Sequence, residues 1–351
     1  MELNYPVRFG PIFKERIWGG RRLETVLGKT PPPGRPIGES WEISEHGDNC
    51  TAVVNGPQRG KTLRDLIREF PRAFPLRPAR LAASSDDRPA GFPLLVKWID
   101  AREKLSVQVH PPDGHPRLPP GESGKTECWM IVAAEAESQI YLGLRRGFDR
   151  ASLVRELERG TLEHCLNVFP ARPGDFYFVP AGTVHAIGAG VLVAEVSQSS
   201  DMTLRLFDWN RVDPATGRPR ELQIEASLDC IHYQAVPSGP VHIPPVTSSR
   251  TGPATQASEP TPADKPPIPR LLGPDQCPYF SVAARHIVVA TVLGEAGGVH
   301  VLICIGGTGE ITGGGETLAV RCGDTILLPA EGEFVCTSKS GLQLLDAWVP
   351  S

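Results

Sequence analysis

The sequence predicts a mainly β protein that contains two β-barrels, a few short helices and a Pro-rich linker. Gly and Pro each occur 36 times in 351 residues, and Val, Ile and Leu stand in short runs between these turn-forming residues. Short apolar runs separated by turns are typical of strands. A segment rich in Pro, Ser and Thr also separates two stretches that repeat each other. We therefore expect a first domain over 1–236, a linker over 237–275 and a second domain over 276–351.

Helices are expected at only a few places. Apolar residues recur three and four positions apart over 62–70, 151–158 and 221–231, which is typical of amphipathic helices. The stretch 71–89, rich in Pro, Arg and Ala, predicts an irregular surface excursion. Within the linker, residues 247–264 predict an extended segment without a packed element.

Four potential metal ligands lie in or near apolar runs of the first domain. Gln108 and His110 are two residues apart in a β-branched stretch, so both side chains project from one face of a strand. Glu127 begins a second apolar run, and His185 follows a third. Because sheet pairing can bring three strands together, this set predicts a divalent metal site, with zinc first and iron or manganese next. The alternative is that both histidines are solvent-exposed loop residues.

A turn motif precedes His185. Gly174-Asp175 is followed by Pro180 and Gly182, which can take the positive φ of a tight turn and so place His185 reproducibly. This spacing resembles the second motif of the cupin superfamily, in which the His points into a small jelly-roll β-barrel.

The motif region has a counterpart beyond the linker. Two pairs of stretches match: Arg172–Pro180 with Arg321–Pro329, and Gly190–Val196 with Gly341–Ala347. The second copy has Phe334 where the first has His185. We therefore expect two cupin-type barrels of common origin, of which only the first binds metal. Alternatively, the Gly-Asp pairs before strands arose by chance.

Composition excludes several classes of protein. The formal net charge is −4, without the basic patch of a nucleic-acid-binding protein. No apolar stretch approaches about 18 residues, and no signal pattern stands at the N-terminus. The eight cysteines have no C-x-x-C spacing, so we expect reduced thiols and a cytoplasmic location. We expect neither a nucleic-acid nor a membrane partner.

Several stretches together resemble short bacterial type I mannose-6-phosphate isomerases, also called phosphomannose isomerases. The resemblance rests on Pro11–Gly20, Ile37–Ser44, Lys97, Leu105–Pro111, Gly124–Glu127, Pro180–His185 and Glu195–Trp209, and it resumes loosely at Cys277–Phe280. It implies a zinc-dependent enzyme that interconverts mannose 6-phosphate and fructose 6-phosphate. By resemblance, Gln108, His110, Glu127 and His185 are the ligands of one Zn²⁺ per chain. The resemblance also implies that the second domain lies away from the chemistry.

The resemblance also assigns roles around the metal. Arg205 matches the active-site arginine, and Glu195, Lys125, Ser106 and Lys97 match residues of the substrate pocket. We expect Arg205 and Glu195 to be catalytic and the other three to bind the substrate. Glu195 lies in a strand that is apolar on both faces, where a carboxylate is costly unless it is paired or functional. Its alternative is a buried ion pair with an arginine.

Three of these residues also have ordinary structural explanations. Arg205 alternates with apolar residues, so its guanidinium can bind phosphate or stabilise an enediolate, but it is otherwise a surface arginine. Lys125 is a second phosphate candidate, or a solvated lysine. Trp18 is a candidate pocket wall, or a core residue.

Two other functions use the same residues. Two His and one carboxylate also form the facial triad of an iron-dependent cupin dioxygenase. A sugar-phosphate-binding regulator without turnover is the non-enzymatic alternative. In each case the expected partner is a small molecule, and the chain is a monomer or a homodimer.

Overall fold

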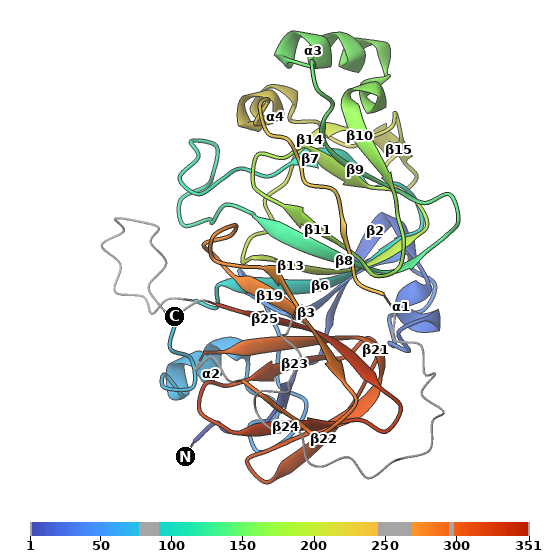
Figure 1. Cartoon of the computed structure of the whole chain (residues 1–351). Helices are drawn as coiled ribbons and strands as arrows, with labels where there is room; N and C mark the ends of the chain where they lie inside the picture. Colours follow the sequence, from blue (N-terminus) through green and yellow to red (C-terminus); the bar gives the residue numbers. More distant parts are fainter. Residues whose placement is uncertain (1, 77–90, 245–268, 295–297, 350–351) are drawn as a thin grey trace.

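The computed structural model describes residues 2–76, 91–244, 269–294 and 298–349. The protein is mainly β, as the sequence predicts, and its large sheets lie in layers (Figure 1). Helices α3 and α4 lie at one end of the molecule, and the C-terminal strands lie at the other end. Most of the predicted surface excursion over 71–89 and all of the predicted extended segment 247–264 lie outside the described residues.

The central layer is a seven-stranded antiparallel sheet. In order across the sheet, its strands are β17 (Val241–His242), β11 (Asp175–Val179), β8 (Glu127–Ala134), β13 (Val191–Gln198), β6 (Leu94–Ala101), β2 (Ile12–Gly20) and β3 (Ile37–Ile43). Every residue of β3, β6 and β13 is buried. These strands are covered on both faces, which explains the long apolar runs of β6 and β13. Strand β3 is equally buried, although two glutamates and a serine lie in it.

A five-stranded sheet packs against one face of the central sheet. Its strands in order are β10 (Leu166–Pro170), β9 (Gln139–Leu144), β12 (His185–Ile187), β7 (Val107–Val109) and β14 (Leu204–Phe207). An apolar cluster that includes Ile131, Leu142 and Val193 fills the space between the two sheets. On the outer face of the five-stranded sheet, a second cluster includes Leu153 and Leu228 of the two helices that cover it.

The C-terminal strands form a nine-stranded sheet. Its main path is β1 (Val7–Arg8), β23 (Thr325–Leu328), β21 (His300–Gly313), β25 (Leu342–Trp348), β19 (Ser281–Ile287) and β18 (Arg270–Leu272), and β20 (Thr291–Leu293), β22 (Glu316–Arg321) and β24 (Phe334–Thr337) branch from it. Val96 and Met130 of the central sheet share a buried cluster with Val301 and Leu345 of this sheet. The N-terminal strand β1 pairs with β23, so both ends of the chain contribute to this layer.

The helices follow the sequence prediction closely. They are α1 (Arg22–Thr25), α2 (Leu63–Glu69), α3 (Arg150–Arg159), α4 (Ile224–Cys230) and the 3₁₀ helix η1 (Leu162–Cys165), and the short hairpins are β4 (Glu45–His46) with β5 (Asn49–Cys50) and β15 (Val212–Asp213) with β16 (Arg218–Pro219). The predicted helices at 62–70 and 151–158 are confirmed as α2 and α3. A reciprocal capping box between Thr62 and Asp65 begins α2.

The third helix starts later than residue 221, where the sequence predicts it. The carbonyl of Glu221 accepts a hydrogen bond from Arg205 Nη1 at 2.8 Å, and the side chain of Gln223 accepts one from the Arg205 backbone at 3.0 Å. These residues are bound to strand β14, so the helical turn begins only after them.

The predicted internal repeat has a structural counterpart. Strands β11, β8, β13 and β6 are neighbours in that order, and β23, β21, β25 and β19 follow the same order in the C-terminal sheet. Gly174 and Gly323 both have positive φ, of 92° and 94°, at the matching turns. The described strands form open sheets stacked face to face, so the two-barrel description and the domain boundaries stay predictions.

Phe334 serves packing in the C-terminal half. Its side chain is fully buried with Leu302, Cys304 and Leu344. Phe334→Ala is expected to lower the free energy of unfolding by about 3–5 kcal/mol, because it leaves a large cavity. Urea unfolding would show this loss. Val335→Ala on the same strand, where the side chain is 39% exposed, is the matched control, with an expected loss below about 1 kcal/mol. Equal losses would contradict the assignment.

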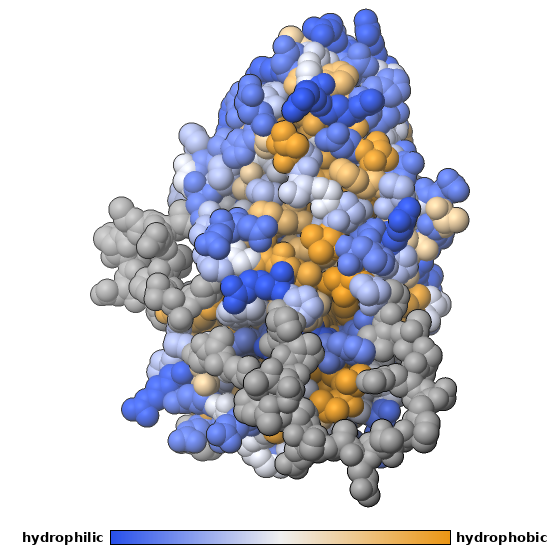
Figure 2. Space-filling model, in the orientation of Figure 1, coloured by the Kyte–Doolittle hydropathy of each residue, from blue (hydrophilic) through white to orange (hydrophobic). Residues whose placement is uncertain are grey.

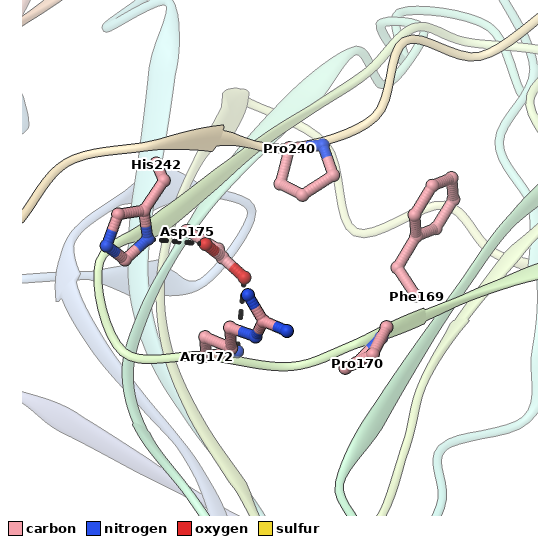
Figure 3. Close-up of a pocket in the computed structure, with 6 residues that line it drawn as sticks. All are labelled: Phe169, Pro170, Arg172, Asp175, Pro240 and His242. Atoms are coloured by element: carbon pink, nitrogen blue, oxygen red, sulfur yellow. Dashed lines mark hydrogen bonds and ion pairs between the residues drawn. The ribbon is translucent and has the colours of Figure 1, made fainter.

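The surface has few specialised features. Hydrophilic side chains cover the end with α3, and hydrophobic ones gather nearer the middle of the face seen in Figure 2. No described helix has the length and apolar character needed to cross a membrane. Beside β17, His242 Nδ1 lies 2.7 Å from Asp175 Oδ1 and holds this short strand to β11 (Figure 3). The hollow there contains none of the predicted site residues, since its lining is Phe169, Pro170, Arg172, Asp175, Pro240 and His242.

Candidate metal centre and active site

The four predicted ligands meet between the central sheet and the five-stranded sheet. Gln108 lies on β7 and His110 follows that strand directly, whereas Glu127 begins β8 and His185 begins β12. His185 lies opposite Gln108 in the β12–β7 pairing, so the two side chains share a face. The structure therefore places together four residues that are spread over 78 positions of sequence (108 to 185).

Three of these residues form a compact, buried cluster. Glu127 Oε2 lies 3.6 Å from His110 Nε2, and Glu127 Oε1 lies 3.4 Å from His185 Nε2. The candidate ligand atoms all lie within 4.8 Å of one another, and no other group of this kind occurs among the described residues. All three side chains are at most 1% exposed. The turn before β12 has the predicted geometry, because Gly182 has a φ of 82°.

Backbone carbonyls orient both imidazoles. His110 Nδ1 donates to Met202 O at 2.8 Å, and His185 Nδ1 donates to Thr183 O at 2.9 Å. Each ring therefore presents the lone pair of Nε2 toward Glu127, which is the usual arrangement of metal-binding histidines. Burial lowers the pKa of His185 to about 3, and burial also lowers the pKa of His110. Both rings are thus neutral near pH 7.

The surroundings of the Glu127 carboxylate indicate whether a metal ion fits this cluster. Neither of its carboxylate oxygens has a hydrogen-bond partner among the described residues, although Lys125 Nζ lies 2.6 Å from Oε2. Burial alone would raise the pKa of Glu127, but the positive charge of Lys125 holds it well below its usual value. Lys125 pairs with Oε2 and leaves Oε1 without a charged partner of opposite sign, and a bound cation would offset the cost of this unsatisfied oxygen in a dry interior. The donor set therefore fits a divalent metal.

Gln108 lies beside this cluster with its amide nitrogen toward it. Gln108 Nε2 is 3.3 Å from His185 Nε2, and Gln108 Oε1 accepts from Ser106 Oγ at 3.3 Å. If the amide were turned over, its oxygen would face the cluster in place of its nitrogen. Ser106 therefore contacts a predicted ligand, and its own side chain is buried.

A series of ion pairs with alternating charge begins at Glu127. Lys125 Nζ lies 3.3 Å from Glu195 Oε1, and Lys97 Nζ lies 3.8 Å from the same oxygen. The buried partners of Glu195 are thus two lysines and not an arginine, and Lys125 is buried and not solvated. Burial raises the pKa of Glu195. Burial alone would lower the pKa of Lys125, but Glu127 and Glu195 raise it.

Three charged residues that the sequence analysis did not select extend this series. Asp201 Oδ1 lies 2.9 Å from Lys97 Nζ, and Arg16 Nε lies 2.9 Å from Glu39 Oε1. Arg16 Nη2 also lies 4.0 Å from Asp201 Oδ2. Burial alone would raise the pKa of Asp201, but Lys97 lowers it to about 2.

Different signals were available for these residues. Asp201 lies only a few residues after the strand that contains Glu195, and this closeness in sequence could have marked it as a site residue. Alternation could not predict which face of the sheet Arg16 lies on, because the register of β2 shifts on either side of Glu15.

Arg205 shares the face of the ligands. Arg205 lies opposite Gln108 in the β14–β7 pairing, and Gln108 in turn lies opposite His185 in the β7–β12 pairing. The three residues thus form one row across the sheet. Arg205 Nη1 donates to Glu221 O, and its Nε is buried without a hydrogen-bond partner among the described residues. Burial and Arg220 lower the pKa of Arg205, which still keeps its charge near neutral pH.

Trp18 lies in the core. It is 3% exposed and belongs to the apolar cluster that contains Trp129. The Trp129 ring packs edge-on against His185, with ring centroids 5.2 Å apart. Trp18 is therefore a core residue, which is the alternative that the sequence left open.

Fold and site together define a layered, mainly β protein with a His–Glu–His cluster able to hold a metal beside buried, alternating charges. Comparisons with known proteins narrow this class. Residues 7–120 match the family model of the catalytic domain of phosphomannose isomerase type I. Mannose-6-phosphate isomerase ManA of Bacillus subtilis (strain 168) is 35% identical over 332 residues, which are 94% of this chain and 95% of that relative.

Solved structures agree with this relationship. The mannose 6-phosphate isomerase from Bacillus subtilis aligns with a TM-score of 0.79 at 31% identity and covers 98% of this chain and 99% of its own. A mannose 6-phosphate isomerase bound with zinc and yttrium shares the fold, with a TM-score of 0.65 at 16% identity over 99% of both chains. The chain belongs to the type I phosphomannose isomerase family.

Proposed function

We propose that this protein interconverts mannose 6-phosphate and fructose 6-phosphate and carries one Zn²⁺ per chain. The observation that supports this best is the continuous set of buried charges from Glu127 through Lys125 and Glu195 to Lys97, next to two neutral imidazoles. Such a site combines ligands for a cation with groups that can bind and deprotonate a polar substrate. The relatives at about one third identity are named as isomerases of this sugar phosphate.

His110, Glu127 and His185 would hold the zinc ion, and Gln108 would join them through its amide oxygen. When bound, zinc supplies Lewis acidity toward the sugar oxygens. The ligand set is mixed nitrogen and oxygen, as in catalytic zinc sites.

The reaction moves protons between neighbouring atoms of the sugar. From mannose 6-phosphate, C2 loses a proton and O1 gains one, and the enediol then gains a proton at C1 and loses one at O2. A base near C1 and C2 must therefore accept and return a proton. Glu195 suits this role, because burial raises its pKa toward the range of an acid–base catalyst. Lys125 and Lys97 hold its Oε1 in place.

Arg205 is proposed to bind the anionic part of the substrate. Its planar guanidinium can make two parallel hydrogen bonds to a phosphate or to an enediolate oxygen. The free Nε and the row shared with Gln108 support this role. Lys125, Lys97 and Ser106 are proposed to line the pocket, with Trp18 supporting it from the core.

We further propose the finer organisation that the sequence predicts. The first domain would be the metal-binding cupin domain, 1–236, and the second, 276–351, a degenerate cupin domain that Phe334 fills in place of a ligand. The shared strand order of the two sheets supports this division. A cytoplasmic location and a monomeric or homodimeric state are part of the same proposal.

A coupled assay tests the function directly. Fructose 6-phosphate formed from mannose 6-phosphate would be followed with the protein as purified, after chelation, and after zinc is restored. We expect activity, its loss with the fold retained by circular dichroism, and its recovery. Metal-independent turnover or no turnover in the zinc-loaded protein would contradict the proposal.

A further inference from the structure

The series of buried charges reaches the surface at Asp201 and Arg16. Glu195 and Lys97 have side chains that are each 3% exposed. The side chains of Asp201 and Arg16, by contrast, are 38% and 31% exposed. In the central sheet, β13 and β6 lie between β8, which carries Glu127, and β2, which carries Arg16. The site is therefore open to solvent at the end away from the metal ligands.

The backbone of β3 makes room for Arg16 at this open end. The register of the β2–β3 pairing shifts by one residue at Gly38, which is an extra residue on the β3 side. Bulges of this kind often lie next to active sites and change the direction of a side chain. A Cβ atom on residue 38 would lie 2.7 Å from Arg16 Cβ and 2.8 Å from Arg16 Cγ. Glycine at this position therefore allows the stem of Arg16 to lie across β3.

Glu39 fixes the orientation of the Arg16 guanidinium. Arg16 Nε donates to Glu39 Oε1 at 2.9 Å, and Arg16 Nη2 donates to Glu39 Oε2 at 3.1 Å. The indole nitrogen of buried Trp41 also donates to Glu39 Oε2, at 2.7 Å. Arg16 Nη1 has only a long contact, of 3.4 Å, with the backbone oxygen of Glu15. The pair with Glu39 thus leaves the Nη1–Nη2 edge of a pre-oriented guanidinium for an anion.

Lys14 provides a second positive charge beside Arg16. It lies opposite Glu39 in the β2–β3 pairing, and its Nζ lies 4.6 Å from the centre of the Trp41 ring. The ammonium group donates to the neutral side chain of Asn49 and forms no ion pair with a described residue. Burial and the positive charge of Arg16 lower the pKa of Lys14. An anion bound beside both cations would offset the repulsion between them.

We propose that Arg16, assisted by Lys14, binds the phosphate group of the substrate at the open end of the site. C1 and C2 react at the metal end, and the 6-phosphate is at the opposite end of the carbon chain. Arg205 lies in one row with Gln108, so it faces the reacting end and stabilises the enediolate. The identity of the sugar rests on the proposed isomerase function, whereas phosphate binding by Arg16 does not depend on turnover.

The test measures binding of glucitol 6-phosphate to the zinc-loaded, full-length protein by calorimetry. This six-carbon phosphate has no carbonyl group and is not isomerised. Arg16→Gln is expected to weaken its binding roughly 10- to 100-fold, because charge-assisted hydrogen bonds are lost. Arg16→Lys should retain part of the affinity. With mannose 6-phosphate, Arg16→Gln should raise KM by a similar factor and leave kcat and zinc content nearly unchanged, as loss of uniform binding does.

A double variant separates phosphate binding from a purely structural role of Arg16. Arg16→Gln by itself leaves the Glu39 carboxylate without its guanidinium partner, which can disturb the fold. Arg16→Gln combined with Glu39→Gln removes both charges of the pair. If Arg16 only neutralises Glu39, the double variant binds glucitol 6-phosphate as well as Glu39→Gln alone. The proposal expects it to bind at least roughly tenfold more weakly than Glu39→Gln alone.

Arg64→Gln is the matched control. Arg64 Nε lies 3.0 Å from Glu45 Oε1, and its side chain is 45% exposed on helix α2. This variant should keep wild-type affinity and KM. If Arg16→Gln binds glucitol 6-phosphate like the wild type, or if the double variant binds it as well as Glu39→Gln, the proposal is wrong. If the wild type binds glucitol 6-phosphate but does not isomerise mannose 6-phosphate, the proposed function fails, and the binding measurements still decide the role of Arg16.

Discussion

His185→Ala is expected to lose bound metal and isomerase activity together. His185 Nε2 lies 3.4 Å from Glu127 Oε1, and its Nδ1 is committed to Thr183 O. Without this imidazole, one of the two nitrogen ligands is lost, and the remaining His110, Glu127 and Gln108 are expected to bind zinc much more weakly. Loss of Lewis-acid stabilisation worth about 4 kcal/mol corresponds to a roughly 1000-fold lower rate. Metal analysis and the coupled assay on the same preparation measure both effects.

The ligand assignment needs a variant that does not open a cavity. Glu127→Gln keeps the shape of the side chain but removes its charge, and it should also lose zinc. His164→Ala is the control, because its side chain is 67% exposed and lies away from the cluster. It should retain full metal content and activity. Full zinc occupancy in His185→Ala would show that the assignment is wrong.

Arg205→Lys is expected to lose activity while it keeps its metal. The charge is retained, but the planar guanidinium group, which can bind an anion through two nitrogens, is lost. Loss of such a contact costs about 2–4 kcal/mol of transition-state stabilisation, or roughly 30- to 1000-fold in rate. Zinc content and melting temperature should hardly change, since Arg205 lies beside the ligand row and is not a ligand.

The kinetic constants then assign the role of Arg205. A fall mainly in kcat indicates that it stabilises the enediolate, and a rise mainly in KM indicates uniform binding of the phosphate. Arg150→Lys is a suitable control, because Arg150 forms its ion pairs with Asp229 and Glu225 on the helical surface. Wild-type constants in Arg205→Lys would remove this residue from the active site.

The sequence by itself determined the mainly β class, two of the three predicted helices in nearly full extent, and the neighbourhood of the metal cluster. Local rules are sufficient for these features. Alternation placed Gln108 and His110 on one face, and the φ of Gly182 confirms the turn that precedes His185. The matching strand orders likewise support the repeat that the two Gly-Asp turns indicated.

Only the tertiary structure decided which charges meet. Lys97 and Asp201 are 104 residues apart, yet they form one ion pair, because β6 and β13 are neighbours in the central sheet. The late start of α4 has the same cause, since Glu221 and Gln223 bind Arg205 before the helix begins.

Side-chain periodicity specifies a face, whereas pairing between distant strands and layers specifies the partner on that face. For this reason the sequence could predict that the candidate ligands lie close together, but not which charged residues pair beside them.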